Sequence, residues 1–438
     1  MRFAGLLRNG ASSMNYQAPK GTYDILPEEQ TYWRYVIART HQVCQLYGYE
    51  QIEVPVFEET SLFERGVGET TDIVEKEMYT FPDRSGDSLT LRPEFTAGIC
   101  RAYAEHGLHG RPQPLRLYAI GPAFRYERPQ AGRFRQFFQI DVEVLGSQDP
   151  AIDLEVMLVA WELYAAMGIK GLSFQVNSTG CPVCRPGYLE MLKGYYAERV
   201  DALCEDCQRR LDRNPLRLLD CKNEPCQPMI ETAPRIMDSL CAECDGHFKE
   251  LRTYLDALQR PYRINHRLVR GLDYYTKTVF EVWAQGIGAQ NAVCGGGRYD
   301  GLIERVGGPS TPAIGFASGI ERIILTMKSE GVIPPELPKP RVCVAYLGLD
   351  AKASAVALTQ DIRANQIGAT ALWENRSLKA QMKHADRLGV AYTLILGTNE
   401  VNAGTVTVRR MADSVQAVVS RAEVIDLVSG RKDFPCSS

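Results

Sequence analysis

The sequence lacks any long apolar run and carries little net charge. None of its hydrophobic stretches approaches the roughly 18 residues that a helix needs to cross a bilayer. The first 13 residues hold arginines around an apolar patch that is too short for the core of a signal peptide. The net charge of −3 argues against a protein that coats nucleic acid over its whole surface. We therefore expect a cytoplasmic protein, whose true start is either Met1 or Met14.

Two common nucleotide-binding motifs are also missing. Three glycines at 295–297 follow a predicted strand, but neither the lysine of a P-loop nor the glycine spacing of a dinucleotide fingerprint accompanies them. Such a run instead allows a flat ligand to lie against bare backbone. The composition is that of an ordinary globular protein, 45% hydrophobic and 24% charged, in 438 residues. That length exceeds what one core usually holds, so two or three domains are expected.

Periodicity near the N-terminus predicts a helix and then an interrupted strand. Apolar residues at helical spacing over 27–47 predict a long amphipathic helix. Ile52, Val54 and Val56 then alternate with polar residues, which predicts a strand. Pro55 lies inside it and limits it to an edge or a bulge, where a second subunit can pack.

A predicted hairpin carries the most informative pattern. One face of the strand 117–125 holds small residues and an arginine, namely Ala119, Gly121, Ala123 and Arg125. The returning strand 138–144 alternates apolar residues with Gln139, Asp141 and Glu143. An apolar back and a polar front suit the floor of a polar pocket, and the missing side-chain volume next to it leaves room for a ligand. The alternative is a sheet surface that faces solvent. Four arginines lie from Arg125 to Arg135, a density that fits polyphosphate or nucleic acid.

Two further stretches each allow two interpretations. Glu94 precedes a helix-like segment, so it can neutralise a ligand's ammonium group or simply favour the positive end of that helix. Arg270 has a planar charged fork suited to a phosphate or a carboxylate. The alternative for Arg270 is a structural ion pair with Asp273. Tyr274 and Tyr275 follow and add flat apolar surface with hydroxyl groups.

Two more helices have clear start signals. Asp149 and Pro150 predict the first turn of an apolar helix that runs to Met167. Gly319 leads from a predicted strand into a helix whose first turn presents Arg322, a position that suits a phosphate.

Eight of the thirteen cysteines lie in residues 171–259, which we call the inserted segment because its composition differs from that of its flanks. They are Cys181, Cys184, Cys204, Cys207, Cys221, Cys226, Cys241 and Cys244. Disulfides are disfavoured in a reducing cytoplasm, and paired Cys-x-x-Cys motifs are more often tetrahedral zinc ligands. One or two structural zinc ions are therefore expected, and the alternative is a set of small buried thiols that bind no metal.

The C-terminal part has a composition of its own. Four prolines in 331–340 indicate a linker. Strands and helices then alternate over 341–438, which predicts a small α/β domain with a mainly parallel sheet.

Taken together, these stretches resemble the bacterial histidyl-tRNA synthetases, which are class II aminoacyl-tRNA synthetases. Residues 124–127 with 133–135 are similar to class II motif 2, 319–322 to motif 3, and Pro55 stands where motif 1 has a dimer-interface proline. Two stretches are similar to the signatures particular to the histidine enzymes. They are Arg-Gly-Leu-Asp-Tyr-Tyr at 270–275 and Gly-Gly-Gly-Arg-Tyr-Asp-Gly-Leu at 295–302.

The resemblance implies an α+β architecture and a homodimer. The expected parts are a class II catalytic domain with a six-stranded antiparallel sheet (16–170 and 260–330), a helical, cysteine-rich insertion (171–259), a linker (331–340) and a C-terminal α/β anticodon-binding domain (341–438). Residues 1–15 form an N-terminal extension without a family counterpart. Zinc is not a general feature of the family, so the resemblance adds nothing to the zinc prediction.

The resemblance also implies two reactions and a role for each matched residue. L-Histidine and ATP, with Mg²⁺, give histidyl-adenylate and pyrophosphate, and the acyl group then moves to the 3' end of tRNA(His). Arg125 is expected at the α-phosphate, with Arg133 and Arg322 nearer the other phosphates and Glu127 in the same ATP site. The histidine site is expected to comprise Glu94 and Thr96 at the amino group, Gln139 at the carboxylate side, Glu143 with Tyr275 at the imidazole, and Tyr274. Arg128 and Gln130 match positions that meet the acceptor end of the tRNA.

The implied mechanism depends mainly on fixed positive charge. Attack of the histidine carboxylate on the α-phosphorus brings two anionic groups together, and Arg125 and Arg270 can clamp that phosphate without titrating. Two rival functions are a synthetase-like regulatory subunit of histidine biosynthesis and a nucleic-acid-binding protein. The first would typically lack the anticodon-binding domain and have eroded histidine motifs, and the second would leave the polar strand and the phosphate arginines unexplained.

Overall fold

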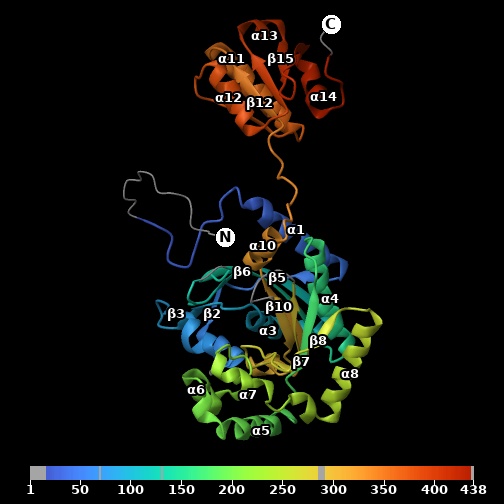
Figure 1. Cartoon of the computed structure of the whole chain (residues 1–438). Helices are drawn as coiled ribbons and strands as arrows, with labels where there is room; N and C mark the ends of the chain where they lie inside the picture. The colour runs from blue at the N-terminus through green and yellow to red at the C-terminus, as the bar shows by residue number, and fades with distance from the viewer. Residues whose placement is uncertain (1–15, 69–70, 130–131, 285–291, 436–438) are drawn as a thin grey trace. The chain divides into compact units, whose positions relative to one another are not determined.

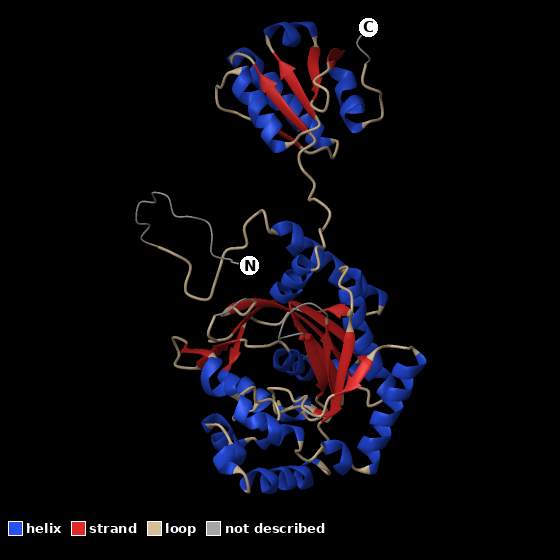
Figure 2. Ribbon diagram, viewed as in Figure 1, coloured by secondary structure: helices blue, strands red, loops and turns tan. Residues whose placement is uncertain are grey.

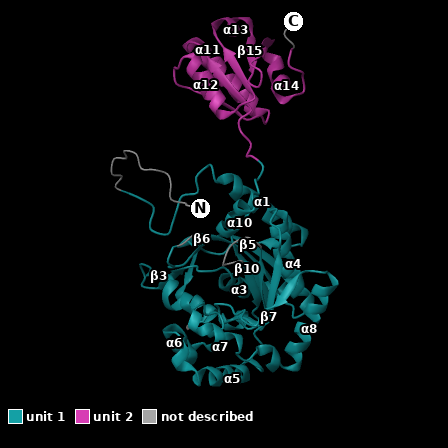
Figure 3. Cartoon of the chain, in the orientation of Figure 1, with its two compact units in different colours: residues 1–335 teal, residues 336–438 magenta. Residues whose placement is uncertain are grey.

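The structure of the chain, a computed structural model, describes residues 16–68, 71–129, 132–284 and 292–435. It divides into two compact units, residues 1–335 and 336–438 (Figure 3). This boundary lies inside the proline-rich stretch 331–340, where the residues from Val332 to Pro340 belong to no helix or strand. The predicted N-terminal extension lies outside the described residues.

An eight-stranded sheet forms the centre of the first unit (Figure 2). In spatial order its strands are β1 (Glu50–Gln51), β5 (Leu115–Phe124), β6 (Gln136–Leu145), β11 (Ala313–Gly319), β10 (Ala292–Arg298), β9 (Thr276–Trp283), β7 (Ser173–Ser178) and β8 (Tyr262–Ile264). The strands from β5 to β7 are antiparallel to their neighbours, whereas the short β1 and β8 are added in parallel at the two edges. The expected six-stranded antiparallel sheet is thus confirmed, with one short parallel strand beside each edge.

The strand predicted over 52–56 is wrong, and Pro55 is the physical reason. The Ile52 N–H still donates to β5 at 2.9 Å, but the residues that follow are not part of the sheet. Proline has no N–H with which to continue the ladder. Arg92 supplies other hydrogen bonds here, since its Nη1 donates to the Val54 carbonyl at 2.6 Å. The chain then enters a small antiparallel sheet of β2 (Phe57–Glu59), β4 (Ser88–Leu91) and β3 (Tyr79–Pro82).

Helices surround the large sheet. Those of the first unit are α1 (Gln30–Leu46), α2 (Thr60–Val67), α3 (Thr96–Glu105), α4 (Pro150–Ala166), α5 (Arg185–Ala197), α6 (Glu205–Arg213), α7 (Gln227–Glu231), α8 (Ala242–Ala257), α9 (Leu302–Arg305) and α10 (Ile320–Ser329). The predicted helices over 27–47 and 149–167 are confirmed as α1 and α4, and the one after Gly319 as α10. Asp149 caps α4 by accepting a hydrogen bond from the Ala151 N–H at 2.8 Å.

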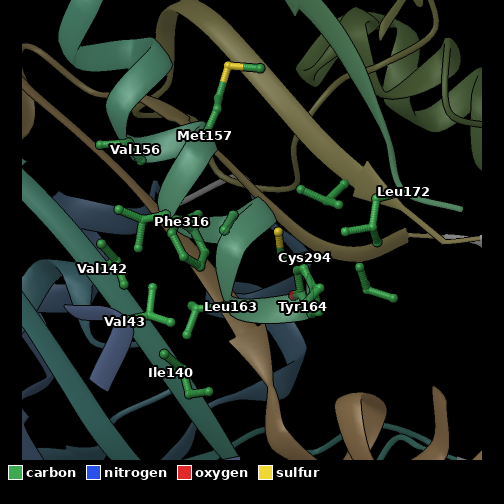
Figure 4. Close-up of a cluster of buried hydrophobic side chains, with 14 of the residues drawn as sticks. Val43, Ile140, Val142, Val156, Met157, Leu163, Tyr164, Leu172, Cys294 and Phe316 are labelled. Carbon is green, nitrogen blue, oxygen red and sulfur yellow. The ribbon is translucent and has the colours of Figure 1, made fainter. Parts of the chain in front are cut away.

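Both faces of the large sheet are buried, but they differ in chemistry. One face packs against α1, α4 and α10 in an apolar core that includes Ile140, Val142 and Phe316 (Figure 4). The other face meets α3 and α9, and its core contains Tyr275 and Tyr299. Polar side chains of β6 are buried on this second face, which therefore holds the candidate site.

The inserted segment begins in the sheet and continues outside it. Its first strand, β7, pairs with β9. The helices α5 to α8, green to yellow in Figure 1, follow with the short 3₁₀ turns η3 (Val200–Ala202), η4 (Pro215–Leu218), η5 (Glu224–Cys226) and η6 (Ile236–Ser239). Helices α5 to α7 contribute to a separate hydrophobic cluster that includes Tyr188, Leu218 and Ile230. Helix α8 instead packs against α4, and its apolar residues belong to the core on that face of the large sheet. The division of the chain into functional domains remains a prediction.

The second unit is a mixed sheet with helices. Its strand order is β13 (Ala369–Ala371), β12 (Val342–Tyr346), β14 (Tyr392–Leu396), β15 (Thr405–Arg410) and β16 (Gln416–Ser420). Its helices are α11 (Leu349–Ala364), α12 (Leu378–Leu388), α13 (Thr398–Ala403) and α14 (Val424–Ser429). The first three strands are parallel as predicted, but β15 and β16 add an antiparallel hairpin, so a mainly parallel sheet is wrong. Among the described residues, no helix is long and apolar enough to cross a membrane.

Candidate active site

The floor of the candidate site is the polar face of β6. The strand register pairs Gly121 of β5 with Gln139 of β6, as the alternation in the hairpin predicted. It also pairs Gly315 of β11 with Glu143, a neighbour that the sequence did not predict. Gln139, Asp141 and Glu143 are 7%, 0% and 1% exposed. The alternative of a sheet surface that faces solvent is therefore wrong.

Glycines on this face make room for side chains of the protein itself. A Cβ atom on Gly295 would overlap the guanidinium of Arg270, and one on Gly297 would lie 2.9 Å from Cδ1 of Tyr275. We expected the glycine run to leave bare backbone open to a ligand. In the structure Arg270 and Tyr275 fill that space, so the run seats two residues of the 270–275 signature against the sheet.

Glu143 lies at the centre of a hydrogen-bonded cluster. Its Oε1 accepts from the Thr96 hydroxyl at 2.8 Å, and its Oε2 accepts from the Tyr299 hydroxyl at 2.5 Å. Burial raises the pKa of Glu143 to about 8, and the two hydroxyl donors oppose that rise. Tyr274 completes the cluster, because its ring centroid lies 4.8 Å from that of Tyr275 and 5.6 Å from that of Tyr299. Tyr299 was not among the predicted site residues, although it belongs to the 295–302 signature.

Glu94 caps helix α3. Its Oε2 accepts from the Thr96 N–H and its Oε1 from the Ala97 N–H, both at 2.8 Å. The interpretation as a helix-end carboxylate therefore holds in this structure. Burial raises the pKa of Glu94, although these backbone donors act in the opposite direction. Because each carboxylate oxygen has two lone pairs, the cap leaves acceptor capacity for a ligand.

Arg270 forms an ion pair with Glu281 of β9, with 2.8 Å between Nη1 and Oε1. The Trp283 indole N–H donates to the other oxygen of Glu281 at 2.9 Å. Asp273 Oδ1 accepts a hydrogen bond from Asn214 Nδ2 at 2.9 Å. The ion pair that the sequence offered as an alternative thus has Glu281 in place of Asp273. The Arg270 side chain keeps 25% of its surface exposed, so a ligand can reach it.

The other predicted phosphate-binding arginines lie around the same sheet. Arg125 donates from Nε to the Pro93 carbonyl at 2.9 Å, directly beside Glu94 in the sequence. Arg322 donates from Nη1 to the Ala292 carbonyl at 2.7 Å. Burial lowers the pKa of Arg322, and the nearby charge of Arg133 lowers it further. The charges of Arg322 and Arg133 thus influence each other.

The loop between β5 and β6 carries the remaining predicted residues. Arg133 is exposed and forms a 3.4 Å ion pair with Glu127. Arg128 is also exposed. Gln130 lies outside the described residues.

Asp141 is a polar residue of the floor to which the sequence assigned no role. Within the described part of the chain, neither of its carboxylate oxygens has a hydrogen-bond partner, and neither does Oε1 of Gln139. Burial raises the pKa of Asp141 well above its ordinary value, and the carboxylates of Glu143 and Glu94 add to the rise. Buried polar atoms without partners are rare and costly, which indicates a place for ligand donors. The alternation of β6 contained this signal, because it put Asp141 between two predicted ligands.

The eight cysteines of the inserted segment form two groups of four. The first cysteine cluster consists of Cys181, Cys184, Cys241 and Cys244, and the second of Cys204, Cys207, Cys221 and Cys226. Within each cluster all four sulfur atoms lie within 4.8 Å of one another, an arrangement that could hold a metal ion. All eight are free thiols. The sequence predicted the ligand type but could not say which pairs meet.

Comparisons with known proteins agree with this geometry. The sequence profile of the family "Histidyl-tRNA synthetase" matches residues 21–181 and 192–323, and that of "Anticodon binding domain" matches 341–431. The histidine–tRNA ligases of Desulforamulus reducens and Dehalococcoides mccartyi are 52% and 50% identical over 413 and 410 residues. These matches span 94% of this chain in both cases, and 99% and 98% of the relatives.

A solved structure gives the same result. The histidyl-tRNA synthetase of S. aureus, without ligands, superposes with a TM-score of 0.79 at 37% identity, covering 94% of this chain and 99% of that one. An ATP phosphoribosyltransferase regulatory subunit/histidyl-tRNA synthetase from Bacillus halodurans is 22% identical with a TM-score of 0.59, a likeness of fold alone. The family profiles cover most of the chain, and the chain belongs to the histidyl-tRNA synthetases.

Proposed function

We propose that the protein is an ATP-dependent ligase that joins L-histidine to tRNA(His). The observation that carries this proposal is the buried polar floor of β6, in a chain about 50% identical to histidine–tRNA ligases along nearly its whole length. The regulatory-subunit alternative is not favoured, because the chain has the anticodon-binding unit and both histidine signatures.

The amino-acid end of the ligand has suitable partners on the floor. Glu94 and Thr96 would receive the ammonium group of histidine, together with the carboxylate oxygens of Asp141 that have no hydrogen-bond partner among the described residues. The amide of Gln139 would serve the carboxylate side. The imidazole ring would lie between Glu143 and Tyr275, with Tyr274 behind them. A hydrogen-bonded group buried to this extent discriminates strongly against a substrate that lacks the matching donor.

The phosphate end depends on positive charge held in place. Arg125 and Arg270 would hold the α-phosphate while the histidine carboxylate attacks it, and Arg322 and Arg133 would meet the outer phosphates, with Glu127 next to them. Arg270 must then exchange part of its pairing with Glu281 for the phosphate, or hold both. Mg²⁺ bound with ATP would neutralise further phosphate charge. The substrate carboxylate is the nucleophile, so no side chain has to become one.

The tRNA and a second subunit complete the proposal. Arg128 and Gln130 would meet the acceptor end, and residues 341–438 the anticodon, in keeping with the matched family profile. A homodimer is proposed through the Pro55 region, whose short strands β1 and β2 leave edges that a second copy can cover. The free thiols fit a reducing compartment, which supports a cytoplasmic location.

We also propose that the cysteine clusters hold structural zinc. Four thiolates around one tetrahedral ion form a closed structural site. The residues fit this use, because each cluster offers four sulfur atoms that lie within 4.8 Å of one another.

Histidine-dependent exchange of pyrophosphate into ATP, measured without tRNA, tests the proposed reaction. The ligase catalyses the exchange, whereas a regulatory subunit and a nucleic-acid-binding protein do not. Exchange that any other amino acid supports equally well would contradict the assignment of histidine. Aminoacylation of tRNA(His), compared with that of a tRNA for another amino acid, then tests the second step.

A further inference from the structure

We propose that the two cysteine clusters are two separate zinc sites, and that the first one positions the histidine-binding segment 275–277. This inference rests on the zinc proposed above. It adds the number of ions, the four ligands of each, and a physical connection from one ion to the active site.

The sulfur spacing fits one ion in each cluster. Cys181 Sγ lies 3.8 Å from the sulfur of Cys184 and 3.8 Å from that of Cys241, and the pair Cys184 and Cys244 is also 3.8 Å apart. A tetrahedron with metal–sulfur bonds of about 2.3 Å has sulfur–sulfur edges of about 3.8 Å. A disulfide would need about 2.0 Å. In the second cluster Cys204 and Cys221 show the same 3.8 Å separation.

Backbone geometry around the first cluster supports the thiolate form that a metal needs. Cys184 is the residue before α5 and Cys241 the residue before α8, so two helix N-termini meet at the sulfurs. The positive end of each helix dipole stabilises negative charge there. The Cys181 N–H also points to the Cys184 sulfur at 3.3 Å. Gly180 has a φ of +67°, and a Cβ atom on it would lie 2.9 Å from that sulfur. Only glycine therefore lets the backbone at this position come so close to Cys184.

The residues next to these ligands hold the start of β9. Arg185, which follows Cys184, donates from Nε to the Thr179 carbonyl at 2.8 Å, and its Nη2 donates to the Tyr275 carbonyl. Glu243, which lies between Cys241 and Cys244, accepts from Nζ of Lys277 at 2.7 Å. The Lys277 N–H donates to the Gly180 carbonyl at 2.8 Å. Segment 275–277 is therefore held from both halves of the first cluster.

The held segment carries a side chain of the candidate site. Tyr275 rests against Gly297, and its ring centroid lies 4.8 Å from that of Tyr274 in a tilted contact; Tyr274 in turn makes an edge contact with Tyr299. The Lys277 side chain is only 7% exposed, and its residue adopts a φ of +48°, a conformation that surrounding contacts have to maintain. Loss of the first zinc would free both anchors of this segment and let Tyr275 shift on the glycine run.

Metal analysis of the full-length protein, purified without added metal, tests the two sites. Two zinc ions per chain are expected in the unaltered protein. One is expected in the double variant Cys181→Ser/Cys184→Ser, and one in Cys204→Ser/Cys207→Ser. Fewer than about 0.5 zinc per chain in the unaltered protein would defeat the zinc proposal itself. A single ion that either double variant removes would overturn the separation into two sites.

Pyrophosphate exchange on zinc-replete variants tests the connection to the active site. Lys277→Met keeps all eight ligands but loses the contact with Glu243, and it should raise the KM for histidine about tenfold while the KM for ATP changes less. Lys277→Arg should restore most of the affinity because it can still pair with Glu243. Lys249→Met is the matched control, since Lys249 pairs with Asp245 on the exposed side of α8, the helix that also carries Glu243.

A double-mutant comparison excludes a merely structural effect. Cys181→Ser/Cys184→Ser should raise the KM for histidine on its own, and adding Lys277→Met should add little, because both changes act through the same connection. A normal KM for histidine in Lys277→Met, with two zinc ions bound, would overturn the positioning role and leave the zinc sites intact. Additive effects of the two changes would overturn it as well.

Discussion

The two faces of β6 belong to one strand and are both buried, yet they have opposite effects on the stability of the fold. Ile140, Val142 and Val144 are 0%, 0% and 1% exposed and need only close packing. Gln139, Asp141 and Glu143 are buried to the same degree, but part of their hydrogen-bonding capacity is unused. Burial of apolar groups stabilises the fold, whereas burial of unpartnered polar groups opposes it. The polar face therefore lowers stability in exchange for a site that a ligand completes.

Truncation on the apolar face should have the largest effect and should act on stability alone. Ile140→Ala leaves a cavity in the core of Figure 4 and is expected to lower the free energy of unfolding by about 2–5 kcal/mol. Urea unfolding followed by tryptophan fluorescence measures this loss. At a temperature where the variant is still folded, its KM for histidine should stay within about twofold of normal. A large KM change would mean that the two faces are not independent.

Loss of positive charge on the polar side should reduce activity and leave stability nearly unchanged. Arg270→Ala removes one of the two proposed clamps on the α-phosphate and should cost on the order of 3 kcal/mol of transition-state stabilisation, a drop of more than about a hundredfold in pyrophosphate exchange. The unfolding midpoint should change little, because the side chain is partly exposed. Arg267→Ala, which removes a nearby arginine paired with Glu231, serves as the control. Near-normal exchange by Arg270→Ala would remove this residue from the mechanism.

The pH dependence of stability should reveal the buried acid. The pKa of Glu143 is raised to about 8 from an ordinary value near 4.5, so the folded state binds the proton more tightly than the unfolded state. Stability should accordingly fall as pH rises from about 4.5 to about 8 and level off above that. Glu143→Gln cannot titrate and should remove this part of the decline, on the order of 4 kcal/mol between pH 5 and pH 8. Urea midpoints at pH 5 and pH 8 test the sign, and an unchanged slope would contradict the assignment.

The smallest effect is expected from Asp141→Asn. The amide keeps the shape of the side chain but cannot take negative charge opposite a ligand's ammonium group. The KM for histidine should rise about tenfold, the value of one charge-assisted hydrogen bond, while stability changes by less than about 1 kcal/mol. Asp149→Asn, a helix cap outside the site, is the control. If Asp141→Asn binds histidine normally, the unpartnered carboxylate serves something other than the substrate.

Much of the fold and part of the site followed from the sequence, because local patterns determine them. The alternation of residues 138–144 predicted which side chains share a face, and the Asp149–Pro150 signal predicted the first turn of α4. The strand predicted over 52–56 does not form, because Pro55 has no N–H to donate to a neighbouring strand, whatever the apolar alternation around it. The hairpin of β15 and β16 was missed, although β15 alternates threonine with the buried Val406 and Val408; only β16 is largely exposed.

What the sequence could not supply were contacts between distant parts of the chain. Arg270 forms its ion pair with Glu281 of β9, although Asp273 is nearer in the sequence. The cysteines of the first cluster are separated by a long stretch of chain that contains the whole second cluster. No spacing rule distinguishes these partners from their neighbours, because the sheet and the helices bring them together.

The place of β11 in the sheet has a consequence for synthesis on the ribosome. β6 borders β11, yet the inserted segment and three further strands of the sheet, β8, β9 and β10, are made between them. Until β11 emerges, the acidic face of β6 has no Gly315 beside Glu143, and its apolar face lacks Phe316. The nested second cluster can close first and the first cluster next, because their residues are already made. The inserted segment is thus complete in the nascent chain before the sheet that carries the candidate site can close.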